Sequence, residues 1–174
     1  MPQLNFARNI GLPHTDLIRI SNGTMTFSPF NLGQSISWNT INIFISKSSA
    51  NMTHTISIGL YSLNGSTLSL ANSASGTFSG SNNQRAYVSL TATSATQNLT
   101  PATWFFGLLF STGGNSGLDI VGQSTINAGN AFPGGFIGGR MTDSTNALPS
   151  SYATSNLDIT GNDGMNVTYI LLTA

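Results

Sequence analysis

Residues 59–73 read GLYSLNGSTLSLANS, two short runs of alternating apolar and hydroxyl side chains on either side of the pair Asn64-Gly65. Alternation with a period of two is typical of a β-strand that buries one face, and both Asn and Gly tolerate the positive φ of a tight hairpin turn. The stretch therefore predicts a β-hairpin with a polar tip. Its hydroxyl-rich faces are suited to hydrogen bonding with water, sugars or another protein.

The same alternation of apolar and hydroxyl residues recurs on both sides of this stretch along the chain. Seven segments, the two arms of the hairpin included, have the composition of strands and are separated by turn-like stretches: residues 23–30, 35–46, 53–62, 66–73, 84–93, 103–111 and 165–173. We expect an eighth strand near residues 117–122 or 135–141. Helix formers are nearly missing, because Glu and Lys together supply one residue. The chain is therefore predicted to be all-β, a jelly-roll-like antiparallel β-sandwich forming a single domain over residues 23–174.

Two segments predict more than their strand character. In SISWNTINIFIS, residues 35–46, the apolar phase changes, which suggests a bulge or bend near Asn39 and Thr40. TWFFGLLF, residues 103–110, is apolar on both faces, so we expect a central strand that is covered on each side, with a neighbouring subunit as one candidate cover. The predicted core includes four large aromatic residues: Trp38, Phe44, Trp104 and Phe106.

The composition excludes several function classes. The chain has five basic residues, five Asp and no Glu, whereas 24 Ser, 21 Thr and 19 Asn supply most of its polar groups. Five scattered basic residues do not make the patch that nucleic-acid binding requires. Cysteine is absent, which removes disulfides and thiol nucleophiles. No run resembles a signal peptide or a membrane helix, so we expect no membrane partner and synthesis in the cytoplasm of the cell that produces the chain.

Reaction chemistry is poorly represented. His14 and His54 are the only candidates for a neutral-pH base, and neither has an obvious carboxylate near it in sequence, so a structural role is favoured for both. Asp158 and Asp163 lie in an oxygen-rich stretch of the kind that can hold calcium, but Asp and Asn beside Gly are also ordinary turn residues, and this second interpretation is favoured. We expect no enzyme activity and no cofactor.

Two stretches are candidates for assembly. In AFPGGFIGGRMTDS, residues 131–144, the glycines would let the backbone lie flat against a neighbour, with Phe132 and Phe136 as apolar anchors and Arg140 pairing with Asp143 or a partner's carboxylate. The N-terminal residues 1–22 are expected to be a docking arm outside the sandwich. Its apolar contacts would come from Leu4, Phe6 and Ile10 together with Leu12 and Leu17.

At the hairpin and at residues 98–122 the sequence resembles the globular β-sandwich heads that end the long fibre proteins of tailed bacteriophages. The similar features are an IGLYS-like strand at residues 58–62, the turn at Asn64-Gly65, a TLSL-like return strand at residues 67–70, and a strand at residues 101–108 that opens a loop rich in Gly, Ser and Asn. The resemblance implies a module of the virion surface that is usually trimeric. The chain departs from such proteins in having no repetitive shaft, which favours direct docking on a capsid, a collar or another fibre subunit.

Two functions follow from this resemblance and the composition. The first is a structural virion protein, a fibre head or capsid decoration that works by oligomeric assembly, as a homotrimer in contact with other virion proteins. The alternative is a receptor-binding tail-fibre tip that recognises a host-surface glycan. For the alternative, the candidate ligand contacts are Tyr61, Asn64 and Tyr152, because exposed tyrosines beside Asn and Ser donors suit sugars.

Overall fold

The computed structural model describes residues 4–5, 16–20, 22–46, 52–80, 85–93, 97–112, 118–124, 139–141, 146–158, 166–168 and 170–173. Within these ranges the chain is almost entirely strand, and its one helical element is a short 3-10 helix, η1 (Thr154–Asn156). The strands are β1 (Leu4–Asn5), β2 (Asp16–Ile20), β3 (Met25–Leu32), β4 (Ile36–Trp38), β5 (Thr40–Ser46), β6 (Met52–Asn64), β7 (Thr67–Gly80), β8 (Arg85–Ala92), β9 (Gln97–Leu99), β10 (Ala102–Thr112), β11 (Leu118–Ser124), β12 (Gly139–Met141), β13 (Ser151–Ala153), β14 (Leu157–Asp158), β15 (Asn166–Thr168) and β16 (Ile170–Thr173).

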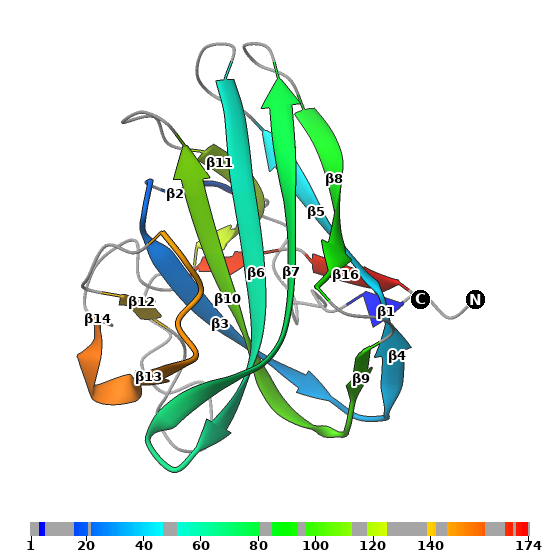
Figure 1. The fold of residues 1–174 in the computed structure, drawn as a ribbon, viewed down its shortest axis with the longest axis vertical. Coiled ribbons are helices and arrows are strands. Elements are labelled where there is room, and N and C mark those ends of the chain that lie inside the picture. Colours follow the sequence, from blue (N-terminus) through cyan, green and yellow to red (C-terminus); the bar gives the residue numbers. More distant parts are fainter. Residues whose placement is uncertain are drawn as a thin grey trace.

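All the strand pairs are antiparallel and form a single sandwich-like domain (Figure 1). The main sheet has the order β1-β16-β5-β8-β7-β6-β10-β3-β12-β14, and β4 pairs with β9 in a small second sheet. Every predicted strand segment contains strand in the structure, and both candidate regions for the eighth strand do so as β11 and β12. The all-β antiparallel fold is thus confirmed. The finer jelly-roll designation stays a prediction.

The hairpin forms where the sequence predicts it. Asn64 pairs with Thr67, so Gly65 and Ser66 are the two loop residues, and Gly65 has a φ of 61°. A positive φ at the first loop position matches the right-handed twist of the flanking strands, which is why glycine suits it. The turn therefore lies one residue later than the Asn64-Gly65 pair itself.

The predicted change of phase near Asn39 is a change of sheet. Strand β4 ends at Trp38 in the small sheet, and β5 begins at Thr40 in the large one. This corner lets the chain keep Trp38 and Ile41 fully buried although they are three positions apart, which would place them on opposite faces of one regular strand. The long predicted strand of residues 35–46 is thus two strands.

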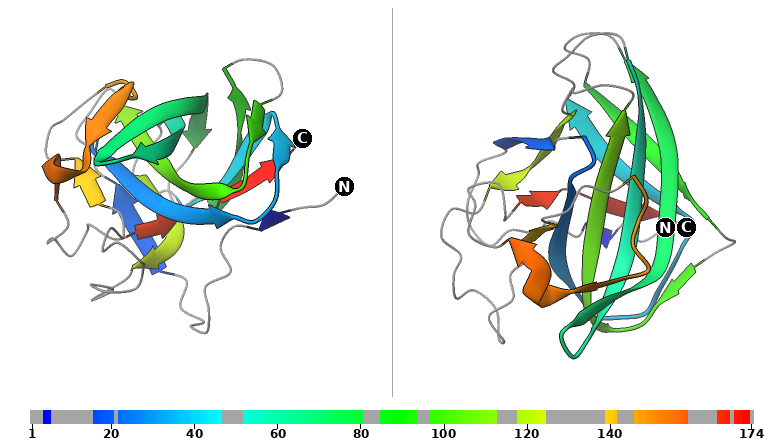
Figure 2. Two further views of the ribbon diagram at one scale, coloured as in Figure 1. Left: turned by 90° about the horizontal axis from the view of Figure 1, so that it is seen from below. Right: turned by 60° about the vertical axis from the view of Figure 1, so that its left-hand side comes forward.

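A main core fills the concave side of the curved sheet, which Figure 2 shows in end view. It is built from the inward-facing side chains of β3 to β10, and Leu172 of β16 also packs there. Trp38, Trp104 and Phe106 are buried in it as predicted. Phe44 is not, because it lies on the opposite side of β5 from the buried Ile43 and Ile45 and is only half-buried.

A second core lies on the other face of β3, β6 and β10. Its buried residues are Met25, Phe27, Tyr61, Leu68, Phe105, Leu109, Met141 and Leu157. Residues 146–158, here called the covering segment and drawn in orange in Figure 1, supply Leu157 and also pack Leu148 and Tyr152 against this core. Strand β10 is therefore covered on both faces as predicted, but by the chain itself, so no neighbouring subunit is needed to cover it.

The N-terminal residues differ from the predicted arm. Asp16–Ile20 is strand β2 and pairs with β11, while Leu4–Asn5 is β1 and pairs with β16. The expectation of an arm outside the sandwich is thus wrong for these two stretches, because their backbone groups find partners along strand edges that other parts of the chain leave open. In the described ranges, no helix has the length and hydropathy needed to cross a membrane.

Candidate functional site

The outer, convex side of the sheet carries a surface of neutral polar groups. Because β6 turns Ile56, Ile58 and Leu60 into the main core, its alternate residues point outward, and the neighbouring strands follow the same rule. We call this surface the hydroxyl face and define it by Thr40 and Asn42 of β5, Thr53, Thr55 and Ser57 of β6, Ser75, Thr77 and Ser79 of β7, and Ser89 and Thr91 of β8. Each of these side chains is exposed or half-buried, and none is charged.

The strand register places these side chains opposite one another. Thr53 pairs with Ser79, Thr55 with Thr77, and Ser57 with Ser75 across β6 and β7. Ser75 is in turn opposite Thr91 of β8, and Thr91 is opposite Thr40 of β5. One row, formed by Ser57, Ser75, Thr91 and Thr40, therefore runs across four strands, each about 4.8 Å from the next.

Hydrogen bonds within the hydroxyl face hold several of its side chains in place. The Oγ1 of Thr53 lies 2.6 Å from the Oγ of Ser79. Ser89 Oγ donates to Asn42 Oδ1 at 2.6 Å, and Asn42 Nδ2 donates to Thr173 Oγ1 at 3.2 Å. Each hydroxyl can still donate or accept further bonds, since it has one proton and two lone pairs. The surface thus offers prearranged neutral donors and acceptors, which can bind a polar ligand but provide no acid, base or nucleophile of unusual reactivity.

Tyr61, predicted to contact a ligand, is fully buried. Its hydroxyl donates to the carbonyl oxygen of Pro149 at 2.9 Å, and its ring meets that of Phe27 edge-on at 5.1 Å. Burial away from water disfavours the phenolate and raises the pKa of Tyr61 well above its ordinary value of 10.0. The prediction of an exposed Tyr61 is therefore wrong.

Tyr61 is buried because the second core covers its face of β6 at this point. Leu60 pairs with Asn72 and Tyr61 with Leu70, so Ala71 is an extra residue in β7, a β-bulge. Leu60 points into the main core and Tyr61 into the second core. With a cover on each side of β6 here, both neighbours are buried.

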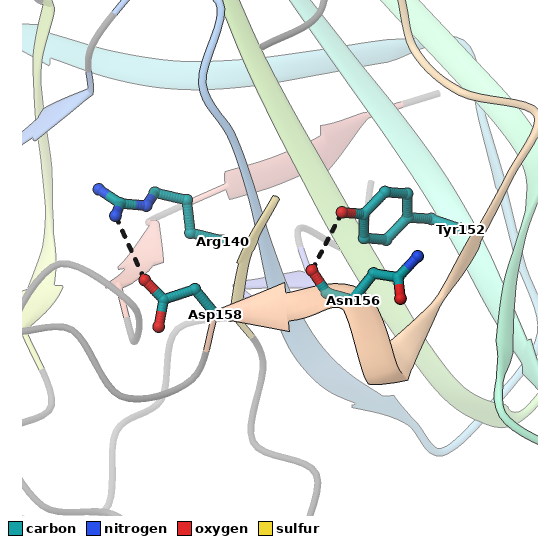
Figure 3. Close-up of polar contacts among 4 residues, drawn as sticks. All are labelled: Arg140, Tyr152, Asn156 and Asp158. Atoms are coloured by element: carbon teal, nitrogen blue, oxygen red, sulfur yellow. Dashed lines mark hydrogen bonds and ion pairs between the residues drawn. The ribbon is translucent and has the colours of Figure 1, made fainter. Parts of the chain in front are cut away.

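The other two candidate ligand contacts, Asn64 and Tyr152, differ in their exposure to solvent. Asn64 is exposed at the hairpin tip. Tyr152 is half-buried in the covering segment, where its ring stacks on Phe27 at 6.0 Å and its hydroxyl donates to the carbonyl oxygen of Asn156 at 3.1 Å (Figure 3). Tyr61 and Tyr152 thus meet around Phe27 as parts of the second core, and of the three predicted contacts only Asn64 is exposed.

Arg140 has a partner within the chain. Its Nη2 lies 3.3 Å from Asp158 Oδ2, across the paired strands β12 and β14 (Figure 3). The sequence predicted Asp143 or a partner's carboxylate, and Asp143 lies outside the described residues. The guanidinium beside Asp158 also competes with any cation for that carboxylate. Asp163 is outside the described residues, and the described ones contain no group of three or more His, Cys, Asp or Glu that could hold a metal ion.

His54 is fully buried on the main-core side of β6. Its ring lies 4.9 Å from that of Phe110 and 6.4 Å from that of Phe78, measured between centroids. An imidazole packed among aromatic rings at this depth is out of reach of a substrate, which agrees with a structural role. His14 lies outside the described residues.

Two of the six predicted assembly residues, Leu4 and Arg140, lie within the described residues. Phe6, Ile10, Phe132 and Phe136 lie outside the described residues, and Leu4 is opposite Leu172 in the pairing of β1 with β16.

The sequence analysis missed one exposed aromatic residue, Tyr87 of β8, which is 79% exposed. The signal was present in the strand pattern, since Val88 and Leu90 are buried and Tyr87 must then face outward with Ser89.

A comparison of the chain with family models, with curated proteins and with solved structures finds no match. We therefore interpret the surface from its own chemistry.

Proposed function

We propose that the chain is a non-catalytic structural module of a bacteriophage particle, a fibre head or capsid decoration that acts by assembling as a homotrimer with other virion proteins. The observation that supports the proposal most is the resemblance to phage fibre heads at residues 58–62, 64–65, 67–70 and 101–108. These residues fall in β6, the hairpin turn, β7 and β10, which are consecutive neighbours in the sheet. The resemblance therefore concerns one continuous part of the fold.

Two of the features expected to form contacts between subunits, strand β10 and Arg140, have partners within the chain. The second face of β10 is covered by the covering segment, and Arg140 already has a carboxylate partner within the chain, Asp158. Contacts between subunits would then fall to the segments that contain Phe6 and Ile10 or Phe132 and Phe136.

Particle composition and oligomeric state test this proposal. Mass spectrometry of purified virions should find the chain at a constant copy number, and a density map should show it on the particle surface. Sedimentation velocity of the purified chain should give a trimer. A monomer at micromolar concentration, together with virions that lack the chain, would overturn the proposal.

A receptor-binding role is the second candidate, and the hydroxyl face is the observation that favours it. An uncharged surface of fixed hydroxyl and amide groups is complementary to a neutral host-surface glycan, whose own groups are hydroxyls and amides. Binding by one copy would be weak, and a trimer on a particle would strengthen it through multivalency. Screening the oligomer on a glycan array, and measuring adsorption of particles from which the chain has been deleted, tests this role; no bound glycan and unchanged adsorption would exclude it.

A further inference from the structure

Tyr87 lies on the same side of β8 as Ser89 and Thr91 of the hydroxyl face and is the one aromatic side chain of β8 there. Among the described residues, the large apolar side chains that are exposed are Tyr87, at 79%, and Leu63, at 40%. A single exposed aromatic residue is ordinary on a protein surface. Tyr87 differs because a second ring supports it: Phe44 is directly opposite on β5, and the two rings meet edge-on at 4.9 Å with an interplanar angle of 64°.

The next pair along the same two strands is polar. Asn42 and Ser89 are opposite each other, two residues from Phe44 and Tyr87, and so lie on the same face about 7 Å away. Ser89 and Thr173 hold the Asn42 amide through its oxygen and its nitrogen, at 2.6 and 3.2 Å. An amide nitrogen carries two protons, and the bond to Thr173 uses one. The amide is thus fixed in orientation and still able to donate.

This combination suits one class of ligand. A sugar ring has an apolar face of C–H groups, which stacks on an aromatic ring, and a rim of hydroxyls, which bond to amides and hydroxyls. Asn42, Ser89 and Thr173 carry no charge, so a chain that extends from Tyr87 toward them meets no counter-charge on that side. Arg85 lies on the other side of Tyr87, two residues back on β8 and opposite Ser46. The fixed amide and the supported ring also lower the entropy cost of binding.

We propose that Tyr87, supported by Phe44 and flanked by Asn42 and Ser89, is the stacking platform for a neutral carbohydrate chain. The inference rests on the receptor-binding role and goes further by naming the binding residues and the charge of the ligand. It moves the expected contact away from Tyr61 and Tyr152, which serve the second core.

Titration of the full chain with three defined hexasaccharides tests the proposal. Chitohexaose and maltohexaose are the neutral probes, and a hyaluronan hexasaccharide is the anionic one. We expect a neutral probe to bind with a Kd of the order of 1 mM or tighter by calorimetry or NMR. Tyr87→Ala should weaken binding at least about tenfold, whereas Tyr87→Phe, which keeps the ring face, should stay within about threefold.

Leu63→Ala is the matched control, because it removes the other exposed large apolar side chain and should leave binding unchanged. Thermal unfolding of Tyr87→Ala should stay close to that of the parent, since the side chain is mostly in water. A loss of binding therefore reports on the platform and not on folding.

The other outcomes separate the platform from the receptor role. If a neutral probe binds the parent and Tyr87→Ala equally, the platform is wrong and the receptor role survives. If only the hyaluronan probe binds, the assignment of a neutral ligand is wrong while a receptor role remains. If no probe binds and a glycan array is also negative, both fail. If Tyr87→Ala lowers the oligomeric state, the face is a contact between copies, and the platform is again overturned.

Discussion

Gly59 of β6 and Gly107 of β10 lie directly opposite each other in the sheet, and the ring of Tyr61 occupies the space beside them. A Cβ atom on Gly107 would stand 2.7 Å from Tyr61 Cε2 and would also collide with the end of Met25. The two glycines therefore make room for the buried tyrosine.

We predict that Gly107→Ala lowers the free energy of unfolding by about 1–3 kcal/mol, the usual cost of overpacking a core. Denaturant unfolding followed by tryptophan fluorescence measures this. Gly33→Ala is the control, because no atom lies within 4 Å of its added Cβ, and it should change stability by less than about 0.5 kcal/mol. Equal effects of the two substitutions would contradict the packing described around Tyr61.

Tyr61→Phe removes the hydrogen bond that links β6 to the covering segment at Pro149. We expect a loss of about 0.5–1.5 kcal/mol in the free energy of unfolding. Amide exchange should also become faster at Leu70, whose N–H donates to Ser150 of the covering segment. Tyr152→Phe, which removes a bond within that segment, should leave the exchange at Leu70 nearly unchanged.

Alkaline pH should destabilise the fold through the same residue. The pKa of Tyr61 is raised in the folded state by burial, so its contribution to stability is intact below the unfolded value of 10.0 and falls as the pH rises above it. The loss should approach about 1.4 kcal/mol for each pH unit above 10. Denaturant melts between pH 9 and 11.5 measure it, and Tyr61→Phe should have a shallower dependence. An identical dependence in both proteins would show that Tyr61 is not the group responsible.

The two faces of the sheet should respond differently to the loss of an aromatic ring. Phe106 is buried in the main core and stacks on Phe30 at 4.1 Å, so Phe106→Ala should cost about 3–5 kcal/mol. Phe44 is half-buried on the outer side of β5, and Phe44→Ala should cost nearer 1 kcal/mol. Denaturant unfolding distinguishes the two. A cost for Phe44→Ala as large as that for Phe106→Ala would place Phe44 in the core after all.

The strands could be predicted because each is long enough to repeat the alternation several times. In residues 53–62 three apolar residues at alternate positions indicate the same buried face. In residues 103–110 apolar residues occupy both sets of alternate positions, which indicates that both faces are buried. Shorter strands such as β13 and β14 contain three and two residues, too few for any period to be recognised. The alternation pattern therefore does not predict the covering segment that contains these strands, nor that this segment covers the second face of β10.

The candidate ligand residues were the least predictable part. Tyr61 was predicted to be exposed because alternation from Leu60 places it on the other face of β6, and the segment that covers this face has no signature in the local sequence. Tyr87 could have been found from the burial of its neighbour Val88. Its ring contact with Phe44 could not, since it depends on the register between two strands that are distant in the chain.

The position of β10 between β3 and β6 has a consequence for how the chain is made. As the protein leaves the ribosome, the hairpin of β6 and β7 can form at once from neighbouring residues. Strand β3 has been synthesised still earlier, but β10, the strand that joins it to this hairpin, ends only at Thr112. Until then two strand edges and one wall of the main core are open to other molecules, and the covering segment arrives later still. The nascent chain therefore passes through a period in which its open strand edges can pair with other molecules, and its few charged residues provide little of the repulsion that opposes such pairing.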